Sequence, residues 1–255
     1  MYRCANQIGR VLDKVYRHAA HVIDAVLVVD NRSPDNSREA AAAAIGSNPA
    51  VPTALVINDE NYSLGGSHKV AFKYALEHGF SHVVVLHGDD QADIGDFVPL
   101  LAAGRHRTCD AVLGSRFLPQ SRLRGYGWFR IFGNTAFNAL FTITTRTIIN
   151  DIGSGLNIFG PKVLAEGDYI NAADDLTFHC FFLLTMVARK RSLMWQPISW
   201  GEEDQISNAR IFKQSKTILW LLIRFAFARR ALLEHNHSNP DFKYAFTTVI
   251  ETFPF

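Results

Sequence analysis

Cysteine is scarce in this chain of 255 residues, which contains three, Cys4, Cys109 and Cys180. Their odd number and wide spacing exclude a disulfide framework and the paired spacing of a zinc site. No apolar run approaches the roughly 20 residues that span a bilayer, and no signal peptide is visible. We therefore expect a cytoplasmic protein with reduced thiols, which lies at most on the inner face of the cell membrane.

Net charge is also low. The formal charge is +2 at neutral pH, which gives little support for a nucleic-acid partner. There is no internal repeat and no clear linker, whereas the 48% hydrophobic content is enough for a sizeable core. We expect a single domain over residues 1–236, followed by a C-terminal tail over residues 237–255.

Strand and helix patterns alternate along the first half of the chain. Apolar runs at residues 25–29, 54–57, 83–86 and 111–113 have the length of buried strands, and amphipathic segments separate them. This alternation predicts the α/β class, as a three-layer α/β/α fold with a doubly wound, mostly parallel sheet. A strand at residues 193–200 is interrupted by Pro197, which predicts an edge strand.

An acidic turn follows the third of these strands and contains His87, Asp89, Asp90 and Gln91. Ligands of doubly wound sheets bind at the carboxyl ends of the strands, where this turn lies. Carboxylates there can hold a divalent cation, although Asp-rich turns also cap the helix that follows. Both interpretations stay open at this level.

Two later segments are amphipathic, basic and aromatic. Residues 121–149 combine arginines with Tyr126, Trp128 and several phenylalanines, and residues 217–233 are rich in Trp, Phe and Leu but contain Arg224, Arg229 and Arg230. Such segments suit a membrane interface or a lipid-bearing ligand, and helices packed on a core give the same pattern.

Five motifs in order resemble the family-two glycosyltransferases of the A-type nucleotide-sugar fold, in particular bacterial enzymes acting on polyprenyl phosphates or polysaccharides. The segments are residues 28–35 (family "VVDDGSxD"), 61–66 ("N-x-G"), 86–91 ("DADxQ"), 114–117 ("GSR") and 151–157 ("D-x-x-S/T-G"). The chain departs from this family twice: its usual first strand, ending in "P-x-Y-N-E", is absent, and His87 replaces the first Asp of the metal turn.

The resemblance implies a nucleotide-sugar donor and a divalent metal, Mn²⁺ or Mg²⁺, which neutralises the diphosphate leaving group. Asp89 is the expected metal ligand, joined by His87 or supported by it through a hydrogen bond. The residues expected to bind the nucleotide sugar are Asp30, Asn31, Asn61, Gly65, Lys69, Asp89, Asp90 and Gln91.

The kind of acceptor determines which further residues the reaction needs. A sugar hydroxyl needs a general base, for which Asp174, Asp175 or the acidic loop at Glu202, Glu203 and Asp204 are candidates. A polyprenyl phosphate needs arginines instead of a base. The candidate arginines are Arg116, Arg122, Arg124 and Arg130.

We therefore expect a metal-dependent, inverting glycosyltransferase that moves a sugar to a lipid-linked or polysaccharide acceptor, with possible contact to a membrane surface. Two alternatives remain: a catalytically impaired homologue that binds sugar nucleotides or lipids, and a sugar nucleotidyltransferase. The second would ordinarily carry a glycine-rich, basic N-terminal loop, which this sequence lacks.

Overall fold

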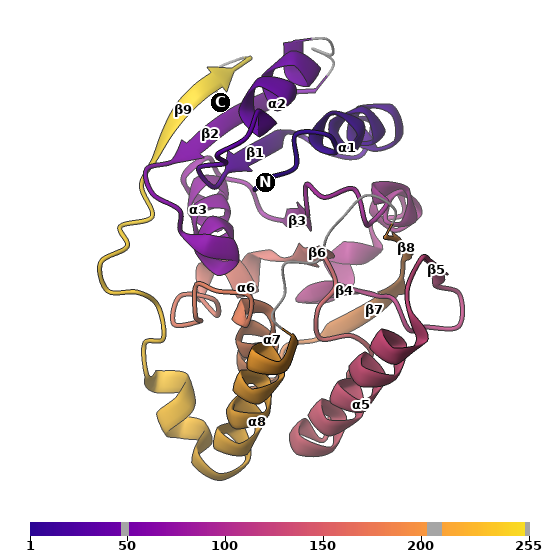
Figure 1. Cartoon of the computed structure of the whole chain (residues 1–255), viewed down its shortest axis with the longest axis vertical. Helices are drawn as coiled ribbons and strands as arrows, with labels where there is room; N and C mark the ends of the chain where they lie inside the picture. The colour runs from indigo at the N-terminus through magenta and orange to yellow at the C-terminus, as the bar shows by residue number, and fades with distance from the viewer. Residues whose placement is uncertain (47–50, 203–210, 253–255) are drawn as a thin grey trace.

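The computed structural model describes residues 1–46, 51–202 and 211–252 (Figure 1). Glu203 and Asp204 therefore lie outside the described residues. The strands are β1 (Val26–Asp30), β2 (Thr53–Asn58), β3 (Val83–Leu86), β4 (Ala111–Ser115), β5 (Arg122–Arg124), β6 (Leu156–Phe159), β7 (Leu193–Pro197), β8 (Ser199–Gly201) and β9 (Phe246–Glu251).

Helices connect most of these strands. The α-helices are α1 (Ile8–Lys14), α2 (Ser37–Gly46), α3 (Ser63–Glu77), α4 (Val98–Ala102), α5 (Trp128–Thr145), α6 (Pro161–Ala165), α7 (Phe178–Ala188) and α8 (Ile211–Glu234). A π-helical turn, Val15–Ala19, extends α1, and short 3₁₀ turns lie at Ile94–Asp96 and Arg105–Thr108. Helix α8 breaks at Ala228, whose backbone angles are not helical.

The strands of the described residues form three hydrogen-bonded groups, in the orders β1-β2-β9, β3-β6-β4-β7 and β5-β8. The pairs β1–β2, β4–β7 and β5–β8 are parallel, whereas β6 and β9 run antiparallel to their neighbours. The sheet is therefore mixed. Strand β7 lies at the edge of its group, as Pro197 predicts.

Helices cover both faces of the strands, which gives the expected three layers. In β1 and β2, Val28 and Leu55 pack against α1 and α2, while Val29 and Val56 pack against α3. In β4, Val112 faces the side of α4, and Leu113 faces the larger core made by α3, α5, α7 and α8. This alternation follows from the two-residue period of a strand.

The N-terminal residue lies against the ends of two strands. The amino group of Met1 donates to the carbonyl of Val29, and the amide of Asn31 donates to the carbonyl of Met1. Gly88, just after β3, packs closely here: a Cβ on it would lie 3.1 Å from the Cβ of Met1, so a larger residue would require its neighbours to shift. Within the described residues, β1 pairs with β2 alone and β3 with β6 alone.

The C-terminal segment, to which sequence reasoning assigned no structure, forms β9 on the edge of β2. Phe242, Tyr244 and Phe246 pack against the face of β1 and β2 that α3 covers. Figure 1 shows this segment running from the end of α8 along the outside of the molecule to β9.

Candidate active site

The acidic turn after β3 is held by the first helix. Asp90 has a left-handed backbone (φ 60°), an uncommon conformation that Asp tolerates better than most residues. Its carboxylate pairs with Arg10 Nε at 2.8 Å and Lys14 Nζ at 2.7 Å. These ion pairs fix the turn against α1, so Asp90 serves the shape of the site.

Asp89 lies beside them in a different environment. Its Oδ1 accepts a hydrogen bond from the amide of Gln91 at 3.3 Å, and among the described residues it has no ion-pair partner. Burial raises the pKa of this carboxyl group. A partly buried carboxylate without a cationic partner is a suitable ligand for a divalent ion.

A cleft of about 440 Å³ opens in front of this turn. Its walls come from α1, the turn, the following 3₁₀ segment, β5 and β8, and they carry four acidic and four basic side chains together with Trp200. The lining residues are Arg10, Lys14, Asp89, Asp90, Gln91, Ala92, Asp93, Gly95, Asp96, Arg122, Arg124, Ser199, Trp200 and Gly201. Such a mixture suits a ligand that carries both phosphates and a metal.

The donor set fits Mg²⁺ or Mn²⁺. Asp89 and the side-chain amide of Gln91 offer oxygen atoms on one wall of the cleft. Mg²⁺ usually takes one or two protein carboxylates and completes its shell with substrate phosphates and water, so a single carboxylate is sufficient.

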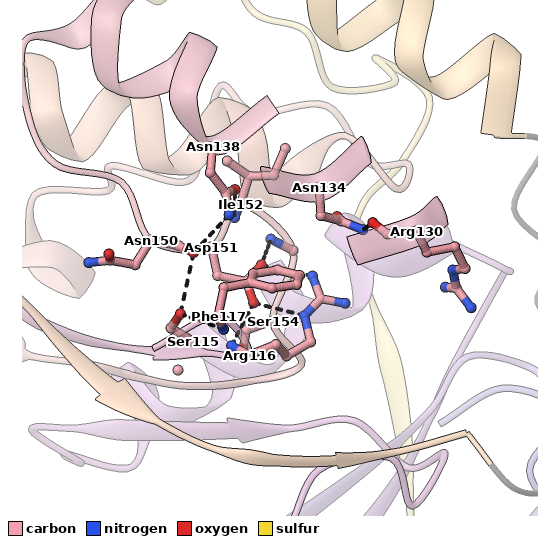
Figure 2. Close-up of polar contacts among 12 residues, drawn as sticks. Ser115, Arg116, Phe117, Arg130, Asn134, Asn138, Asn150, Asp151, Ile152 and Ser154 are labelled. Carbon is pink, nitrogen blue, oxygen red and sulfur yellow. Dashed lines mark hydrogen bonds and ion pairs between the residues drawn. The ribbon is translucent and has the colours of Figure 1, made fainter. Parts of the chain in front are cut away.

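The four arginines expected at the acceptor divide into two kinds. Arg122 and Arg124 project from the short strand β5, are exposed and line the cleft. Arg116 is buried, and its Nε and Nη2 donate to the carboxylate of Asp151 at 2.8 and 2.7 Å (Figure 2). Its guanidinium also stacks on Trp200, 4.9 Å from the ring centroid. Arg116 therefore does not line the cleft itself but packs against Trp200, which does.

Arg130 is the fourth. It forms an ion pair with Glu202, and its guanidinium lies 4.7 Å from the centroid of the Tyr126 ring. Figure 2 shows Arg130 on α5, with its carbonyl accepting a hydrogen bond from Asn134 one turn later. Arg130 joins the start of α5 to the end of β8, and it does not line the cleft.

His87 points away from the cleft. Its ring lies 5.8 Å from the ring of His68 and 5.6 Å from that of His179, centroid to centroid. Asp89, two residues later, lines the cleft, whereas His87 does not. The structure therefore does not bring the two expected metal ligands together on one wall.

The loops after β1 and β2 meet through a network of amides. Asn31 Nδ2 donates to Asn61 Oδ1 at 2.9 Å, and Asn31 Oδ1 accepts from the amide of Tyr62 at 2.8 Å. Asp30 is buried, where its Oδ1 accepts from the amide of Ser33 and its Oδ2 forms a longer ion pair with Arg38 Nε at 3.6 Å. These residues order the two loop ends and do not line the cleft.

The two aspartates expected as general bases are engaged elsewhere. Asp174 is buried, accepts from Lys69 Nζ at 2.9 Å and accepts from the amide of Asn239 at 2.7 Å. Asp175 accepts from the amide and the hydroxyl of Thr177 at the start of α7. Gly65 belongs to the same region, because its amide donates to the carbonyl of Asp174.

Sequence reasoning missed several residues of the cleft. Arg10 and Lys14 lie on the polar face of the first helix, which sequence pattern cannot orient toward a site. Asp96 accepts from the amide of Ser199 at 2.6 Å and so joins the turn to β8, across about 100 residues of chain. The sequence offered one signal for Asp93 and Asp96 as cleft residues, which is that they follow Asp89 closely in the chain.

Comparison with known sequences identifies the protein family that the chain matches. Residues 1–163 match the family described as "Glycosyl transferase family 2". The chain is 24% identical over 197 residues to a polyprenol monophosphomannose synthase of Mycolicibacterium smegmatis, covering 76% of this chain and 66% of the relative. It is 32% identical over 143 residues to an undecaprenyl-phosphate mannosyltransferase of Micrococcus luteus, covering 56% and 57%. The chain thus spans about two thirds and just over half of these two relatives.

Solved structures share the fold. Glucosyl-3-phosphoglycerate synthase from Mycobacterium tuberculosis in complex with UDP superposes with a TM-score of 0.59, at 14% identity and covering 98% of this chain and 84% of the other. The mannosyltransferase PcManGT from Pyrobaculum calidifontis, in complex with GDP-Man and Mn²⁺, gives a TM-score of 0.52 at 18% identity, covering 91% and 62%. At these identities the likeness concerns the A-type glycosyltransferase fold alone.

Proposed function

Because the chain belongs to glycosyl transferase family 2, we propose that it transfers a sugar from a nucleotide-sugar donor to a polyprenyl phosphate in the cleft beside Asp89. One observation carries this proposal. The carboxylate of Asp89, which has no ion-pair partner among the described residues, and two exposed arginines, Arg122 and Arg124, line the same cleft. The carboxylate suits the metal of the donor, and the arginines suit the phosphate of the acceptor.

The donor side depends on Asp89 and Gln91, which would hold a divalent cation together with the donor diphosphate. When bound, the ion neutralises the charge that develops on the leaving group. Arg10 and Lys14 keep Asp90 occupied, so the turn presents Asp89 in a fixed position. The M. luteus and M. smegmatis relatives are named for mannosyl transfer, so a mannose nucleotide is the first donor to test.

We propose that the nucleotide extends beyond the cleft to the loop ends at Asp30, Asn31 and Asn61, which do not line the cleft themselves. Their amide network fixes the carboxyl ends of β1 and β2, at the same sheet edge as the acidic turn. Lys69 and Asp174 form a buried ion pair with each other. We therefore propose that they contribute through the packing of α3 and α7 and do not contact the donor.

The acceptor side depends on Arg122 and Arg124. A phosphate monoester is already a nucleophile, so its oxygen can attack the anomeric carbon of the sugar without losing a proton. One C–O bond forms to the acceptor phosphate while the C–O bond to the diphosphate breaks, and the nucleoside diphosphate leaves. A single displacement of this kind inverts the anomeric configuration. No general base is required, which agrees with the engagement of Asp174 and Asp175 elsewhere.

The lipid chain of the acceptor has an apolar surface close by. Helix α5 begins four residues after β5, and its Trp128 and Phe132 are 78% and 68% exposed. Helix α8 packs against α5 and exposes Phe227 to 88%. None of the described helices is both long enough and apolar enough to cross a bilayer. We propose that α5 and α8 lie on a membrane surface and deliver the polyprenyl chain to the cleft.

A comparison of acceptors tests this function. Purified protein is incubated with a labelled mannose nucleotide, Mn²⁺ and either polyprenyl phosphate or the matching polyprenol, and the label in the organic extract is counted. We expect label in the lipid with the phosphate alone. Equal labelling of polyprenol would point to a hydroxyl acceptor and a general base, and binding of the donor without transfer would favour an impaired homologue.

A further inference from the structure

Three histidines from distant parts of the chain meet in the interior. His68 lies on α3, His87 follows β3, and His179 lies on α7. One ring nitrogen of each lies within 4.8 Å of the ring nitrogens of the other two. Among the described residues, this is the group of side chains whose geometry suits a metal ion.

One ring nitrogen of each of the three histidines in this trio, Nε2, lacks a hydrogen-bond partner. The Nε2 atoms of His68, His87 and His179 are all shielded from solvent, and none has a hydrogen-bond partner. A buried polar atom left unpaired costs about 1–3 kcal/mol. A single ligand that contacts all three rings would satisfy these unpaired atoms together.

The tautomer and the charge of the rings also suit a metal. His68 Nδ1 lies 2.8 Å from the carbonyl oxygen of Leu64, so Nδ1 carries the proton and Nε2 offers its lone pair. Burial lowers the pKa of His68 to about 4. His68 is therefore a neutral imidazole near pH 7, the form that coordinates metals.

We propose that His68, His87 and His179 bind one transition-metal ion, with zinc the first to test, at a site separate from the cleft. Imidazole nitrogens favour zinc over Mg²⁺ or Ca²⁺, which prefer oxygen. Zinc–nitrogen bonds of about 2.0–2.1 Å in a tetrahedral site place the nitrogens about 3.4 Å apart, so the rings must move together by little more than about 1 Å.

The fourth position does not require a side chain, because a water molecule or hydroxide can complete a zinc site that has three protein ligands. Three neutral ligands leave the charge of the ion uncompensated, so the site favours hydroxide over water as the fourth ligand.

The ion would act as a structural clamp. It would tie α3 and α7 to the end of β3, two residues before Asp89, and so hold the acidic turn in place. Because the site binds the folded chain and needs all three elements, zinc should raise the melting temperature.

Metal content tests the site. The full chain is refolded with Zn²⁺, desalted, and analysed for zinc by mass spectrometry, beside His68→Phe, His179→Phe and two controls. The first control is His106→Phe, since His106 and His82 form another close pair, with rings 5.0 Å apart. The second is Asp89→Ala, which removes the carboxylate of the cleft.

We expect about one zinc per chain in the wild type and both controls, and less than about one tenth in the two trio variants. The wild-type melting temperature should rise by at least about 5 °C with zinc and should not respond to Mg²⁺. Co²⁺ in place of zinc should give the intense visible absorption of a tetrahedral site, a readout that does not depend on any variant folding.

A wild type without zinc would overturn the proposal, as would zinc that persists in both trio variants or disappears in His106→Phe. Octahedral Co²⁺ would overturn it too. Loss of zinc in Asp89→Ala alone would move the metal to the cleft. The outcome is independent of sugar transfer, so it can fail while the proposed function holds, and the reverse.

Discussion

At the scale of single residues, the proposed chemistry depends most on the carboxylate of Asp89. We predict that Asp89→Asn, which keeps the shape but removes the charge, lowers kcat/KM for metal-dependent transfer by about 100-fold or more. Initial rates over a range of Mn²⁺ concentrations measure this. Asp13→Asn is the matched control, because Asp13 is an exposed partner of Arg17 on α1. A variant with near wild-type rates would remove Asp89 from the metal site.

The buried pair of Arg116 and Asp151 is a structural prediction at the same scale. Asp151→Asn leaves the buried guanidinium without its counter-charge, which should lower the free energy of unfolding by about 3–5 kcal/mol. Urea denaturation measures it. Glu234→Gln breaks the exposed pair with Arg230 and should change the free energy of unfolding far less, because solvent screens that pair. Equal effects of the two changes would contradict the supporting role of Arg116.

In protein kept metal-free with a chelator, the cluster of His68, His87 and His179 should make the free energy of unfolding depend on pH. The unfolded chain takes up a proton at His68 near its ordinary pKa of 6.5, whereas the folded chain does so near 4. Stability contributed by the neutral ring is thus fully present above pH 6.5 and is lost as the pH falls toward 4, by about 3 kcal/mol for this residue. His68→Phe should flatten that part of the profile, measured by urea denaturation at several pH values. An unchanged profile would show that the ring titrates normally.

At the scale of elements, β5 carries the two arginines that we propose bind the acceptor phosphate. We predict that Arg122→Gln combined with Arg124→Gln raises the KM for polyprenyl phosphate about 10-fold to 100-fold, because charge-assisted hydrogen bonds to the phosphate are lost. The KM for the donor should hardly change. Steady-state kinetics in both substrates separate these effects, and exposed Arg107→Gln is the control. A loss confined to the donor KM would place the arginines on the diphosphate instead.

Helices α5 and α8 present the apolar surface proposed to meet the lipid. Replacing Phe132 and Phe227 with Ser should weaken binding to anionic phosphatidylglycerol vesicles about 10-fold per residue, since a buried Phe contributes about 1.5–3 kcal/mol. Flotation measures the bound fraction. Leu76→Ser on α3, also partly exposed, should change little. Wild-type protein that stays unbound at every lipid concentration would refute membrane contact.

Sequence pattern predicted the elements well, because strand runs such as residues 83–86 and the helix at α7 have strong local signals. The acidic turn was placed correctly at the carboxyl end of β3. The sequence did not predict the directions of the side chains. His87 and Asp89 are two residues apart, yet His87 lies beside His68 and His179, whereas Asp89 lines the cleft. Both residues follow Leu86, the last residue of β3, so the two-residue period of a strand no longer fixes their directions.

At the scale of the whole molecule, the cleft is assembled from segments distant in sequence. Helix α1, the turn after β3, β5 and β8 contribute its walls, and the contact between Asp96 and Ser199 closes it. Likewise Asp174 reaches Tyr244 in the C-terminal segment, which also provides β9. Contacts of this range depend on the global packing, and no local pattern announces them. The resemblance therefore predicted the fold and the family, whereas the partners of Lys69, Arg116 and Asp174 came from the structure alone.

The structure of the product tests the central claim most directly. Wild-type protein is supplied with a mannose nucleotide, Mn²⁺ and polyprenyl phosphate, and the purified lipid product is examined by ³¹P and ¹H NMR. The account predicts a phosphodiester between the anomeric carbon and the lipid phosphate, with the configuration inverted relative to the donor. A retained configuration, a sugar attached to another oxygen, or release of free sugar alone would contradict it.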